Sequence, residues 1–166
     1  MSTEPNVTTE ALYLEYWGFI YRLLPTYGVF GPDQDDVAQT VWQNIHTQID
    51  TYDPTRQPPR AWITGFVRRC AANYRRDRRN HPETPCAEPA AAMAAPGLTP
   101  EQYTLLRTLE QVIVDVRHRE AFLLQAQHGL TVPEIADVME TSESQIAWWL
   151  LCVRRTLRAS RGRRFA

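Results

Sequence analysis

Apolar side chains recur at helical spacing in every long segment of the chain. Between residues 9 and 27 they return every three or four positions, until glycines and a proline at 28–32 break the pattern. A second helix is expected to begin near Asp33, with Asp33 as its N-cap. Its apolar positions, spaced four apart, are Val37, Val41, Ile45 and Ile49.

A loop of turn-forming composition at 51–59 precedes a third amphipathic helix, which we expect over 60–79. Pro59 suits the first turn of such a helix. The apolar side of this helix holds Trp62, Ile63, Phe66, Val67, Cys70 and Tyr74. Arginines crowd its other side, so one face packs and the other is basic.

Residues 81–98 contain four prolines around a run of alanines, a density that a helix cannot tolerate. We therefore place a linker at 81–98, between a domain at 8–80 and a domain at 99–160, with a basic tail at 161–166. The predicted fold class is all-α, with two small helical domains.

Three sequence pairs in the second domain match helix-capping boxes: Thr99 with Gln102, Thr131 with Glu134, and Ser142 with Gln145. The helix after the first box is expected to turn inward Leu105, Leu106, Leu109, Val112, Ile113 and Val116. A helix near 119–128 should end at Gly129. The remaining two boxes give a short helix, a turn of about three residues and a helix to about Arg158, which is helix-turn-helix spacing. A plain helical hairpin has the same spacing.

Acidic and basic residues are strongly segregated along the chain, although the net charge is only −1. All 18 cationic residues are arginines. Residues 1–55 hold eight acids and one arginine, whereas residues 56–80 hold eight arginines and one acid. Residues 81–150 are again acidic, and residues 151–166 hold six arginines and no acid. Two basic blocks indicate a polyanion partner, with solvated helix ends as the alternative for either block.

Composition excludes several classes of protein. With 43% hydrophobic and 22% charged residues, the chain is not a disordered tail. No apolar run is long enough for a transmembrane helix, and the first residues lack the pattern of a signal peptide. Three widely spaced cysteines argue for a reducing compartment, so we expect a cytoplasmic protein without membrane insertion.

No pattern of catalytic or metal-binding residues stands out. Acids at 33, 35, 36, 50 and 53 could form a Mg²⁺ cluster, but acids in a first helical turn are favoured by the helix dipole alone. The four histidines lie far apart, and the chain has no Cys-x-x-Cys pair and no Gly-rich phosphate loop. We expect no enzyme activity, no metal and no cofactor.

Aromatic residues beside the first arginine block are more informative. Tyr52, Trp62 and Tyr74 alternate there with arginines, an arrangement that suits stacking of single-stranded bases. Trp62 also lies on the apolar side of its helix, so a role in the core is the alternative for this residue.

Residues 35–79 resemble region 2 of the extracytoplasmic-function sigma factors, the smallest members of the sigma-70 family. The resemblance rests on an acidic pair followed by Val-x-Gln, a Tyr-Asp-Pro loop, an Arg-Ala-Trp helix start and an Arg-rich helix end. Residues 117–158 resemble region 4 of that family through LTVPEIADVMETSESQIAWWLLCVRRTLR. A linker of about 20 residues without a middle domain also fits.

The resemblance implies a surface for core RNA polymerase and two for promoter DNA. The acidic helix would bind a coiled coil of the largest polymerase subunit through Asp35, Asp36, Gln39, Gln43 and Asn44. The loop and third helix would capture the −10 element through Tyr52, Asp53, Arg56, Arg60, Trp62, Arg68, Arg69, Asn73, Arg75, Arg76 and Arg79. The last helix would meet the −35 element or a partner protein through Ser142, Ser144, Gln145, Ala147, Trp148, Trp149, Leu151, Cys152, Arg154 and Arg155.

The chain departs from the family pattern at two places. Asn73 stands where the family usually has Asp. The last helix carries apolar residues where the family usually has basic ones, and we expect an exposed patch of Trp148, Leu151 and Cys152 with Trp149 at its edge. Such a patch could read thymine methyl groups, bind an anti-sigma factor or other protein, or mark a loss of −35 recognition.

The sequence therefore predicts an extracytoplasmic-function sigma factor that directs core RNA polymerase to promoters, melts DNA and starts transcription. We expect it in the cytoplasm, at the nucleoid when polymerase-bound. One alternative is a degenerate sigma-like module that occupies polymerase or a regulator without normal −35 recognition. Another is a stand-alone helix-turn-helix regulator, which would dimerise and bind duplex DNA without polymerase.

Overall fold

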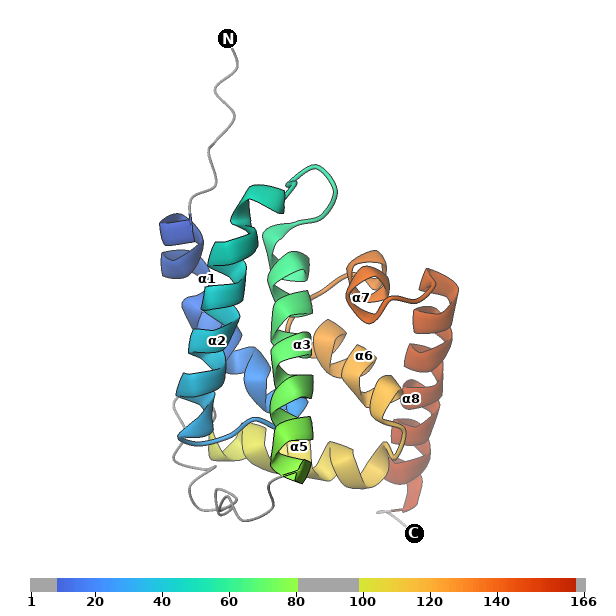
Figure 1. The fold of residues 1–166 in the computed structure, drawn as a ribbon. Helices are drawn as coiled ribbons and strands as arrows, with labels where there is room; N and C mark the ends of the chain where they lie inside the picture. The colour runs from blue at the N-terminus through green and yellow to red at the C-terminus, as the bar shows by residue number, and fades with distance from the viewer. Residues whose placement is uncertain (1–8, 81–98, 164–166) are drawn as a thin grey trace. The chain divides into compact units, whose positions relative to one another are not determined.

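The computed structural model describes residues 9–80 and 99–163, with side chains through residue 160. The predicted linker at 81–98 and the end of the basic tail at 164–166 lie outside the described residues. Every regular element in the described ranges is helical, which confirms the all-α prediction (Figure 1). The chain divides into two compact units, residues 1–97 and 98–166.

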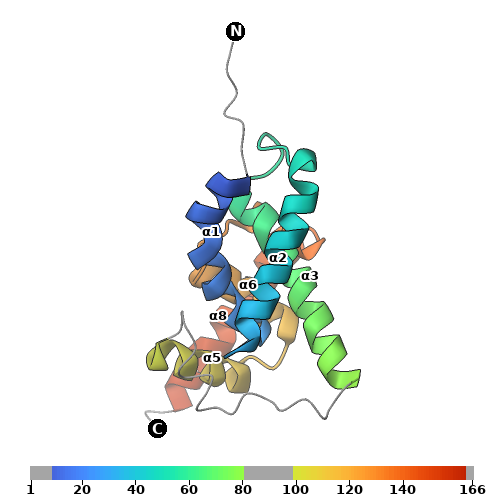
Figure 2. The same cartoon turned by 60° about the vertical axis from the view of Figure 1, so that its left-hand side comes forward.

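The first unit is a small bundle of three long helices joined by short 3₁₀ turns. In chain order its elements are α1 (Thr9–Leu23), η1 (Leu24–Tyr27), α2 (Asp33–Gln48), η2 (Ile49–Thr51) and α3 (Pro59–Asn80). The three α-helices pack side by side, and α2 and α3 run antiparallel on either side of the loop at 52–58 (Figures 1 and 2). This topology brings the start of α2 next to the end of α3.

The apolar stripes read from the sequence form the core of this bundle. Val41 and Ile45 of α2 and Ile63 and Val67 of α3 are fully buried between the helices. Gly28 ends η1 in the left-handed region at φ 77°, where its N–H donates to the Leu24 and Pro25 carbonyls. A side chain at this position would face open space, so the backbone angle is what requires glycine.

Two details at the ends of α2 differ from the prediction. Asp33 is the first helical residue and not the N-cap, because Pro32 precedes it with helical backbone angles. Ile49 lies beyond the helix, in η2, and is half-buried. Both changes leave the buried stripe of α2 intact.

The second unit consists of four helices, and the first three pack against the last one. They are α5 (Pro100–Val112), α6 (Val116–Ala126), α7 (Val132–Met139) and α8 (Glu143–Arg163). Helix α8 contacts each of the other three. Its inner face buries Ile146, Leu150 and Val153.

Two of the three predicted capping boxes are formed at the predicted helix starts, and at the third the Ser142 hydroxyl accepts from the Gln145 N–H at 3.2 Å. The Thr99 hydroxyl accepts from the Gln102 N–H at 3.3 Å, and the Gln102 side chain accepts from the Thr99 N–H at 2.9 Å. The Glu134 carboxylate accepts from the Thr131 N–H at 2.6 Å. Each pair satisfies backbone donors that a helix start leaves without partners.

The expected inward face of the first helix in this unit is partly wrong. Leu106, Leu109 and Ile113 are buried, but Leu105 and Val116 are exposed. Asp115 begins a new helix by accepting from the N–H groups of residues 117 and 118, at 2.9 and 3.1 Å. Because α5 ends before it, the helical period restarts and Val116 no longer belongs to the same face.

Helices α7 and α8 form the predicted helix-turn-helix unit. Glu140 adopts the left-handed region at φ 54° and ends α7, and its N–H donates to carbonyls of the last turn. The Thr141 N–H donates back to the Ala136 carbonyl at 3.0 Å. The resulting turn is three residues long, and Ile135 and Ile146 are buried on its two sides.

Candidate functional site

The outer face of α2 is acidic and polar, as the sequence predicted. Asp35, Asp36, Gln39 and Gln43 are exposed on it. Asn44 differs, because it is half-buried and its amide donates to the Cys70 sulfur at 3.3 Å. Among the predicted residues of this helix, a partner can therefore reach Asp35, Asp36, Gln39 and Gln43.

Asp35 is tied to α1. The Tyr21 hydroxyl donates to the Asp35 carboxylate, and the Gln34 amide donates to the Tyr21 carbonyl at 3.3 Å. Burial, followed by the bond to Asp35, raises the pKa of Tyr21 to about 12, so the phenol stays a hydrogen-bond donor well into the alkaline range. This contact holds the carboxylate of Asp35 beside the aromatic side chains of α1.

The acids considered for a Mg²⁺ cluster do not come together. Asp33 pairs with Arg78, Asp35 accepts from Tyr21, and Asp53 accepts from Thr55. Within residues 9–80 and 99–160, no group of three His, Cys, Asp or Glu side chains is arranged to hold a metal ion. Each of these three carboxylates is therefore bound by a side chain of the same unit.

The loop between η2 and α3 is held by its own side chains. The Asp53 carboxylate accepts from the Thr55 N–H at 2.8 Å and from the Thr55 hydroxyl at 2.7 Å. These bonds lower the pKa of Asp53 and keep it charged. The Tyr52 hydroxyl donates to the Gln57 carbonyl at 3.3 Å. Both ends of the loop are thus pinned, and the exposed residues 53–56 between them form its tip.

Aromatic rings and arginines continue from this loop along α3. The ring centroids of Tyr52 and Trp62 are 4.6 Å apart, and those of Trp62 and Phe66 are 4.9 Å apart. The Arg69 guanidinium lies over the Phe66 ring, 4.7 Å from its centroid. Trp62 is half-buried, so it packs on the core and still offers part of its ring at the surface.

Helix α1 adds residues to this surface that the sequence did not single out. The Arg60 guanidinium lies 4.9 Å from the centroid of the Phe19 ring, and the Tyr16 and Phe19 rings meet edge to face at 6.3 Å. Burial, followed by a hydrogen bond to Glu15, raises the pKa of Tyr16 to about 12. The sequence pattern placed Tyr16 in an apolar stripe, did not single out Phe19, and carried no signal for the contact of these rings with α3.

The second half of α3 presents a basic face. Its exposed members among the predicted residues are Arg69, Asn73, Arg75, Arg76 and Arg79, whereas Arg68 is half-buried. The Arg76 guanidinium donates to the Asn73 side chain at 3.2 Å. A cavity of about 540 Å³ opens beside this face and is lined by Gly28, Ala72, Tyr74, Arg75, Arg78 and Arg79. Several guanidinium groups around one hollow favour an anionic group such as a phosphate.

In the second unit, α8 places the predicted residues on different sides. Ser142 and most of the others are exposed, namely Ser144, Ala147, Trp148, Leu151, Arg154 and Arg155. Gln145 and Cys152 are half-buried. Trp148 is 54% exposed and Leu151 is 44% exposed. The predicted apolar patch therefore exists around these two residues.

Trp149 does not lie at the edge of that patch. It is only 8% exposed, because it turns toward the core of the unit. Its ring lies 5.8 Å from the His118 ring of α6, and the Trp148 ring lies 5.4 Å from the same imidazole. The two neighbouring tryptophans thus have different environments, with one a core residue and the other a surface residue.

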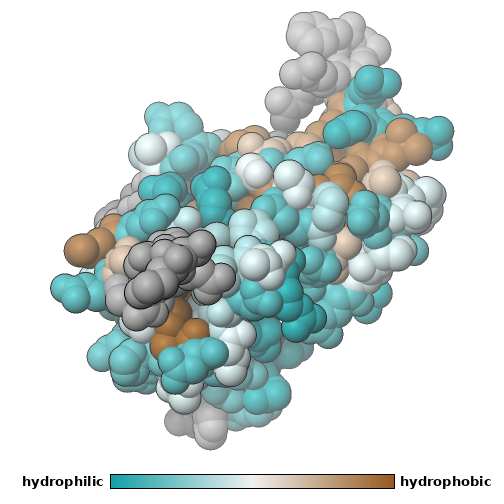
Figure 3. All heavy atoms as spheres, turned by 90° about the horizontal axis from the view of Figure 1, so that it is seen from above, coloured by the Kyte–Doolittle hydropathy of each residue, from teal (hydrophilic) through white to brown (hydrophobic). Residues whose placement is uncertain are grey.

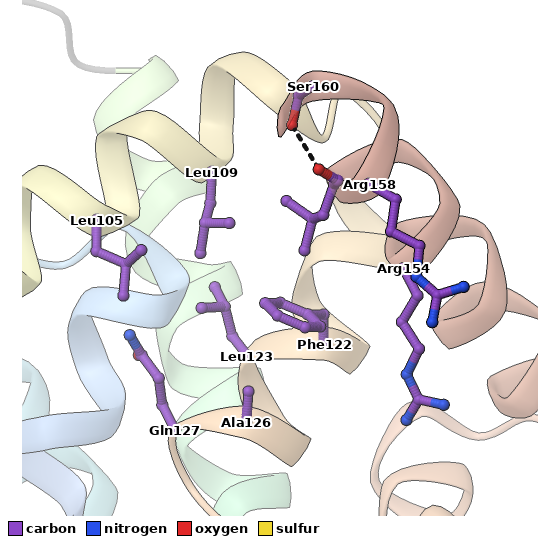
Figure 4. A pocket seen from close by; sticks show the side chains of 10 residues that line it. Leu105, Leu109, Phe122, Leu123, Ala126, Gln127, Arg154, Arg158 and Ser160 are labelled. Carbon is purple, nitrogen blue, oxygen red and sulfur yellow. Dashed lines mark hydrogen bonds between the residues drawn. The ribbon is translucent and has the colours of Figure 1, made fainter. Parts of the chain in front are cut away.

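A second hollow of about 530 Å³ lies between α5, α6 and α8. Leu105, Leu109, Phe122 and Leu123 point into it from α5 and α6 (Figure 4). Its other lining residues are Ala126, Gln127, Arg154, Leu157, Arg158 and Ser160. An apolar floor with arginines at one side suits an apolar element of a protein partner.

Hydrophilic residues cover most of the face that Figure 3 shows, and hydrophobic residues emerge as separate small areas. Within the described part of the chain, no helix combines the length and the apolar character that crossing a membrane requires.

Comparison with known proteins identifies the first unit. The family model for sigma-70 region 2 matches residues 12–81. These residues include the acidic face of α2, the loop and the basic helix α3 up to its last residue. No curated protein matches the chain in sequence.

Solved structures share the fold across both units. The chain is similar to CnrH in its complex with the cytosolic domain of CnrY, with a TM-score of 0.64 and 20% identity over 91% of this chain and 85% of that one. It is also similar to the sigma factor RpoE of Bartonella quintana in complex with the anti-sigma factor NepR. There the TM-score is 0.69, and 15% identity extends over 90% of this chain and 94% of that one.

Proposed function

We propose that this chain, a member of the sigma-70 family, is an extracytoplasmic-function sigma factor that binds core RNA polymerase and directs it to promoters in the cytoplasm. The observation that carries the proposal is the combination found within residues 12–81. An exposed acidic helix face, a pinned aromatic loop and an arginine-rich helix occur in one folded unit. A sigma factor of this kind supplies binding and DNA distortion, and the chemistry of transcription belongs to the polymerase.

The outer face of α2 supports binding of core polymerase. Asp36, Gln39 and Gln43 are exposed, and Asp35 is held in position by Tyr21. Exposed carboxylates on a rigid helix pair with cationic side chains of a protein partner and favour fast, specific association. We assign this face to the polymerase.

The loop and α3 support capture of unpaired promoter bases. Base extrusion costs a few kcal/mol, which stacking and phosphate contacts must offset. The Tyr52 and Trp62 rings offer the stacking surface, and Arg75, Arg76 and Arg79 offer contacts to the backbone. A pinned loop loses little conformational entropy when a base enters, which favours capture.

The second unit supports contact with −35 DNA, a protein partner, or both. Its helix-turn-helix geometry presents α8, whose exposed face combines Trp148 and Leu151 with Arg155. The hollow between α5, α6 and α8 adds a second apolar feature. Two proteins of similar fold were solved with a bound protein, CnrY in one case and the anti-sigma factor NepR in the other. We therefore assign the apolar features of this unit to a protein partner such as an anti-sigma factor.

A run-off transcription assay tests the proposal. It combines bacterial core polymerase, this protein and promoter fragments from the source genome, with polymerase binding measured in parallel. We expect discrete start sites that depend on the protein. Asp35→Arg with Asp36→Arg should abolish polymerase binding, and Arg75→Ala with Arg76→Ala should weaken open-complex formation while polymerase binding persists. Asp137→Arg, an exposed charge reversal in the second unit, is the control for polymerase binding.

The assay also separates the alternatives. Stable polymerase binding without transcription would favour a sigma-like module that occupies polymerase, an outcome to which the exposed Trp148 and Leu151 give weight. Tight duplex binding by a dimer in the absence of polymerase would instead indicate a helix-turn-helix regulator. Unchanged polymerase binding in a folded Asp35→Arg, Asp36→Arg variant would disprove the assignment of α2.

A further inference from the structure

One face of α1 carries a row of aromatic side chains. Tyr13, Trp17 and Tyr21 are four residues apart and therefore lie above one another on the helix. The Tyr13 and Trp17 ring centroids are 4.9 Å apart, and those of Trp17 and Tyr21 are 5.0 Å apart. Trp42 of α2 stacks on Trp17 at 6.3 Å with an interplanar angle of 22°. We call Tyr13, Trp17, Tyr21 and Trp42 the aromatic row.

The aromatic row ends at a carboxylate. The Tyr21 hydroxyl at one end donates to Asp35, the first residue of the exposed acidic face of α2. Tyr13, at the other end of the row, is 42% exposed. Trp17 and Tyr21, which follow it along the row toward Asp35, are half-buried. A group that reaches Asp35 from outside therefore meets the Tyr21 ring first, and the Trp17 ring is the next one along the row.

The same unit contains a completed version of this arrangement. The Tyr74 hydroxyl donates to Asp33 at 2.6 Å, as the Tyr21 hydroxyl donates to Asp35. The pair of Tyr74 and Asp33 also includes an arginine. Arg78 pairs with Asp33 at 2.9 Å, and its guanidinium lies 5.5 Å from the centroid of the Tyr74 ring. In the part of the chain that the structure describes, Asp35 has the tyrosine but pairs with no arginine.

We propose that Tyr21, Asp35 and Trp17 form a receiving site for an arginine of the polymerase, which pairs with Asp35 and stacks on the aromatic row. The inference rests on the proposed function and extends its interface from α2 to α1. A guanidinium is the fitting group, because it binds a carboxylate through two parallel hydrogen bonds and stacks flat on aromatic faces. An ammonium group offers a carboxylate no such fork, and it is more strongly hydrated than a guanidinium.

Charge complementarity identifies the occupant as a cationic partner. Asp35 and Asp36 together present two adjacent negative charges, and the ring faces of Trp17 and Tyr21 add the negative side of their quadrupoles. An apolar partner would leave the Asp35 carboxylate buried without a counter-ion, which is costly. An anionic partner would be repelled.

The test measures the affinity of the full-length chain for bacterial core polymerase. Asp35→Asn removes the charge but keeps the shape, and we expect it to weaken binding about tenfold to a hundredfold. Trp17→Leu keeps apolar area without an aromatic face, and we expect a loss of about threefold to thirtyfold, with Trp17→Phe restoring part of it. Asp50→Asn, an exposed neutralisation in η2 just after the end of α2, is the matched control and should leave binding unchanged.

A double-mutant cycle decides whether the two residues hold one arginine. If they do, Trp17→Leu should cost much less in the Asp35→Asn background than in the original protein. Full additivity, or equal affinities of the Leu and Phe variants at position 17, would overturn the proposal. Circular dichroism of each variant verifies that it is folded.

Further outcomes separate this inference from the proposed function and from other occupants. If Asp36→Arg abolishes polymerase binding while Trp17→Leu has no effect, the interface on α2 stands and the arginine site is wrong. If neither variant affects polymerase binding, the assignment of α2 is wrong and the arginine site fails with it. The proposed function itself fails only if the unaltered protein neither binds polymerase nor produces start sites. The arginine site also fails if Trp17→Leu changes only the self-association of the chain, measured by analytical ultracentrifugation without polymerase.

Discussion

The guanidinium of Arg78 lies 2.9 Å from the carboxylate of Asp33, although the two residues are 45 positions apart in the chain. The pair fastens the last turn of α3 to the first turn of α2. Tyr74 completes the group, because its hydroxyl donates to Asp33 and accepts from Arg78. The pair thereby joins the basic helix that we assign to DNA to the acidic helix that we assign to polymerase.

Breaking this pair should destabilise the first unit. Arg78→Gln and Asp33→Asn should each lower the free energy of unfolding by about 1–3 kcal/mol, because each leaves a half-buried charge without its partner. Urea denaturation checks the size of the loss. The double variant should lose less than the two single losses combined, and strict additivity would show that the contact contributes nothing to stability.

Tyr74 should make stability depend on alkaline pH. Burial, followed by its bond to Asp33, raises the pKa of Tyr74 to about 12 in the folded protein, whereas an unfolded tyrosine titrates near about 10. The protonated phenol is thus favoured by folding, so its contribution is complete below about pH 10 and disappears as the pH rises toward 12. Urea denaturation between pH 8 and pH 11 should show the difference in stability from Tyr74→Phe shrinking, and a constant difference would contradict the assignment.

Asp115 should make stability depend on acidic pH, with stability lost as the pH falls. The N–H of His118 donates to its carboxylate and, with the Arg117 N–H, lowers its pKa in the folded protein. Asp115→Ala should cost about 1 kcal/mol of stability at neutral pH through loss of the helix cap. Because the folded pKa is lowered, this contribution is complete above the unfolded value of about 3.9 and is lost as the pH falls through the folded pKa.

A conservative variant serves as the control for Asp115. Asn also caps helices but does not titrate, so Asp115→Asn should keep most of the stability at neutral pH and lose its acid dependence. Thermal denaturation at several pH values distinguishes the three proteins. Equal stability of the Ala and Asn variants at pH 7 would show that the cap has no energetic role.

Tyr52 should matter for DNA and not for polymerase. Tyr52→Ala removes the ring that packs at a tilt against Trp62, and we expect single-stranded −10 DNA to bind the polymerase complex about 1–3 kcal/mol more weakly. Tyr52→Phe keeps the ring and loses only the bond to Gln57, so most of the affinity should remain. Fluorescence anisotropy of a labelled oligonucleotide measures both. Loss of polymerase binding by Tyr52→Ala would place the ring on the wrong surface.

The neighbouring tryptophans of α8 should separate stability from partner binding. Trp149 is buried, and Trp149→Ala should cost about 3–5 kcal/mol through the cavity it creates. Trp148 is exposed, and Trp148→Ala should change stability by less than about 0.5 kcal/mol while weakening the complex with a protein partner. Thermal denaturation gives the first comparison. Similar stability losses in both variants would show that Trp148 is also a core residue.

The loop and the α2 face show how much of the candidate site the sequence predicts. It predicted the loop of Tyr52 and Asp53 and the exposed acids at Asp35 and Asp36, because turn-forming residues and charges avoid the core. It placed Asn44 with those acids, although this side chain turns inward to Cys70. It gave no indication of Tyr21 as the partner of Asp35, since Tyr21 reads as one more aromatic residue of an amphipathic helix.

The sequence by itself determined which segments are helices and, to within a few residues, where they begin and end, since periodicity, capping boxes and helix-breaking residues act within a few positions of the chain. It also placed basic and acidic residues on the outer helix faces. Only the tertiary structure decided which distant side chains meet, as Arg78 meets Asp33 and Tyr21 meets Asp35. It also decided that Trp149 is buried beside the exposed Trp148. These outcomes depend on the packing angle and rotation of helices against one another, which arise from contacts across the whole core and leave no local pattern in the chain.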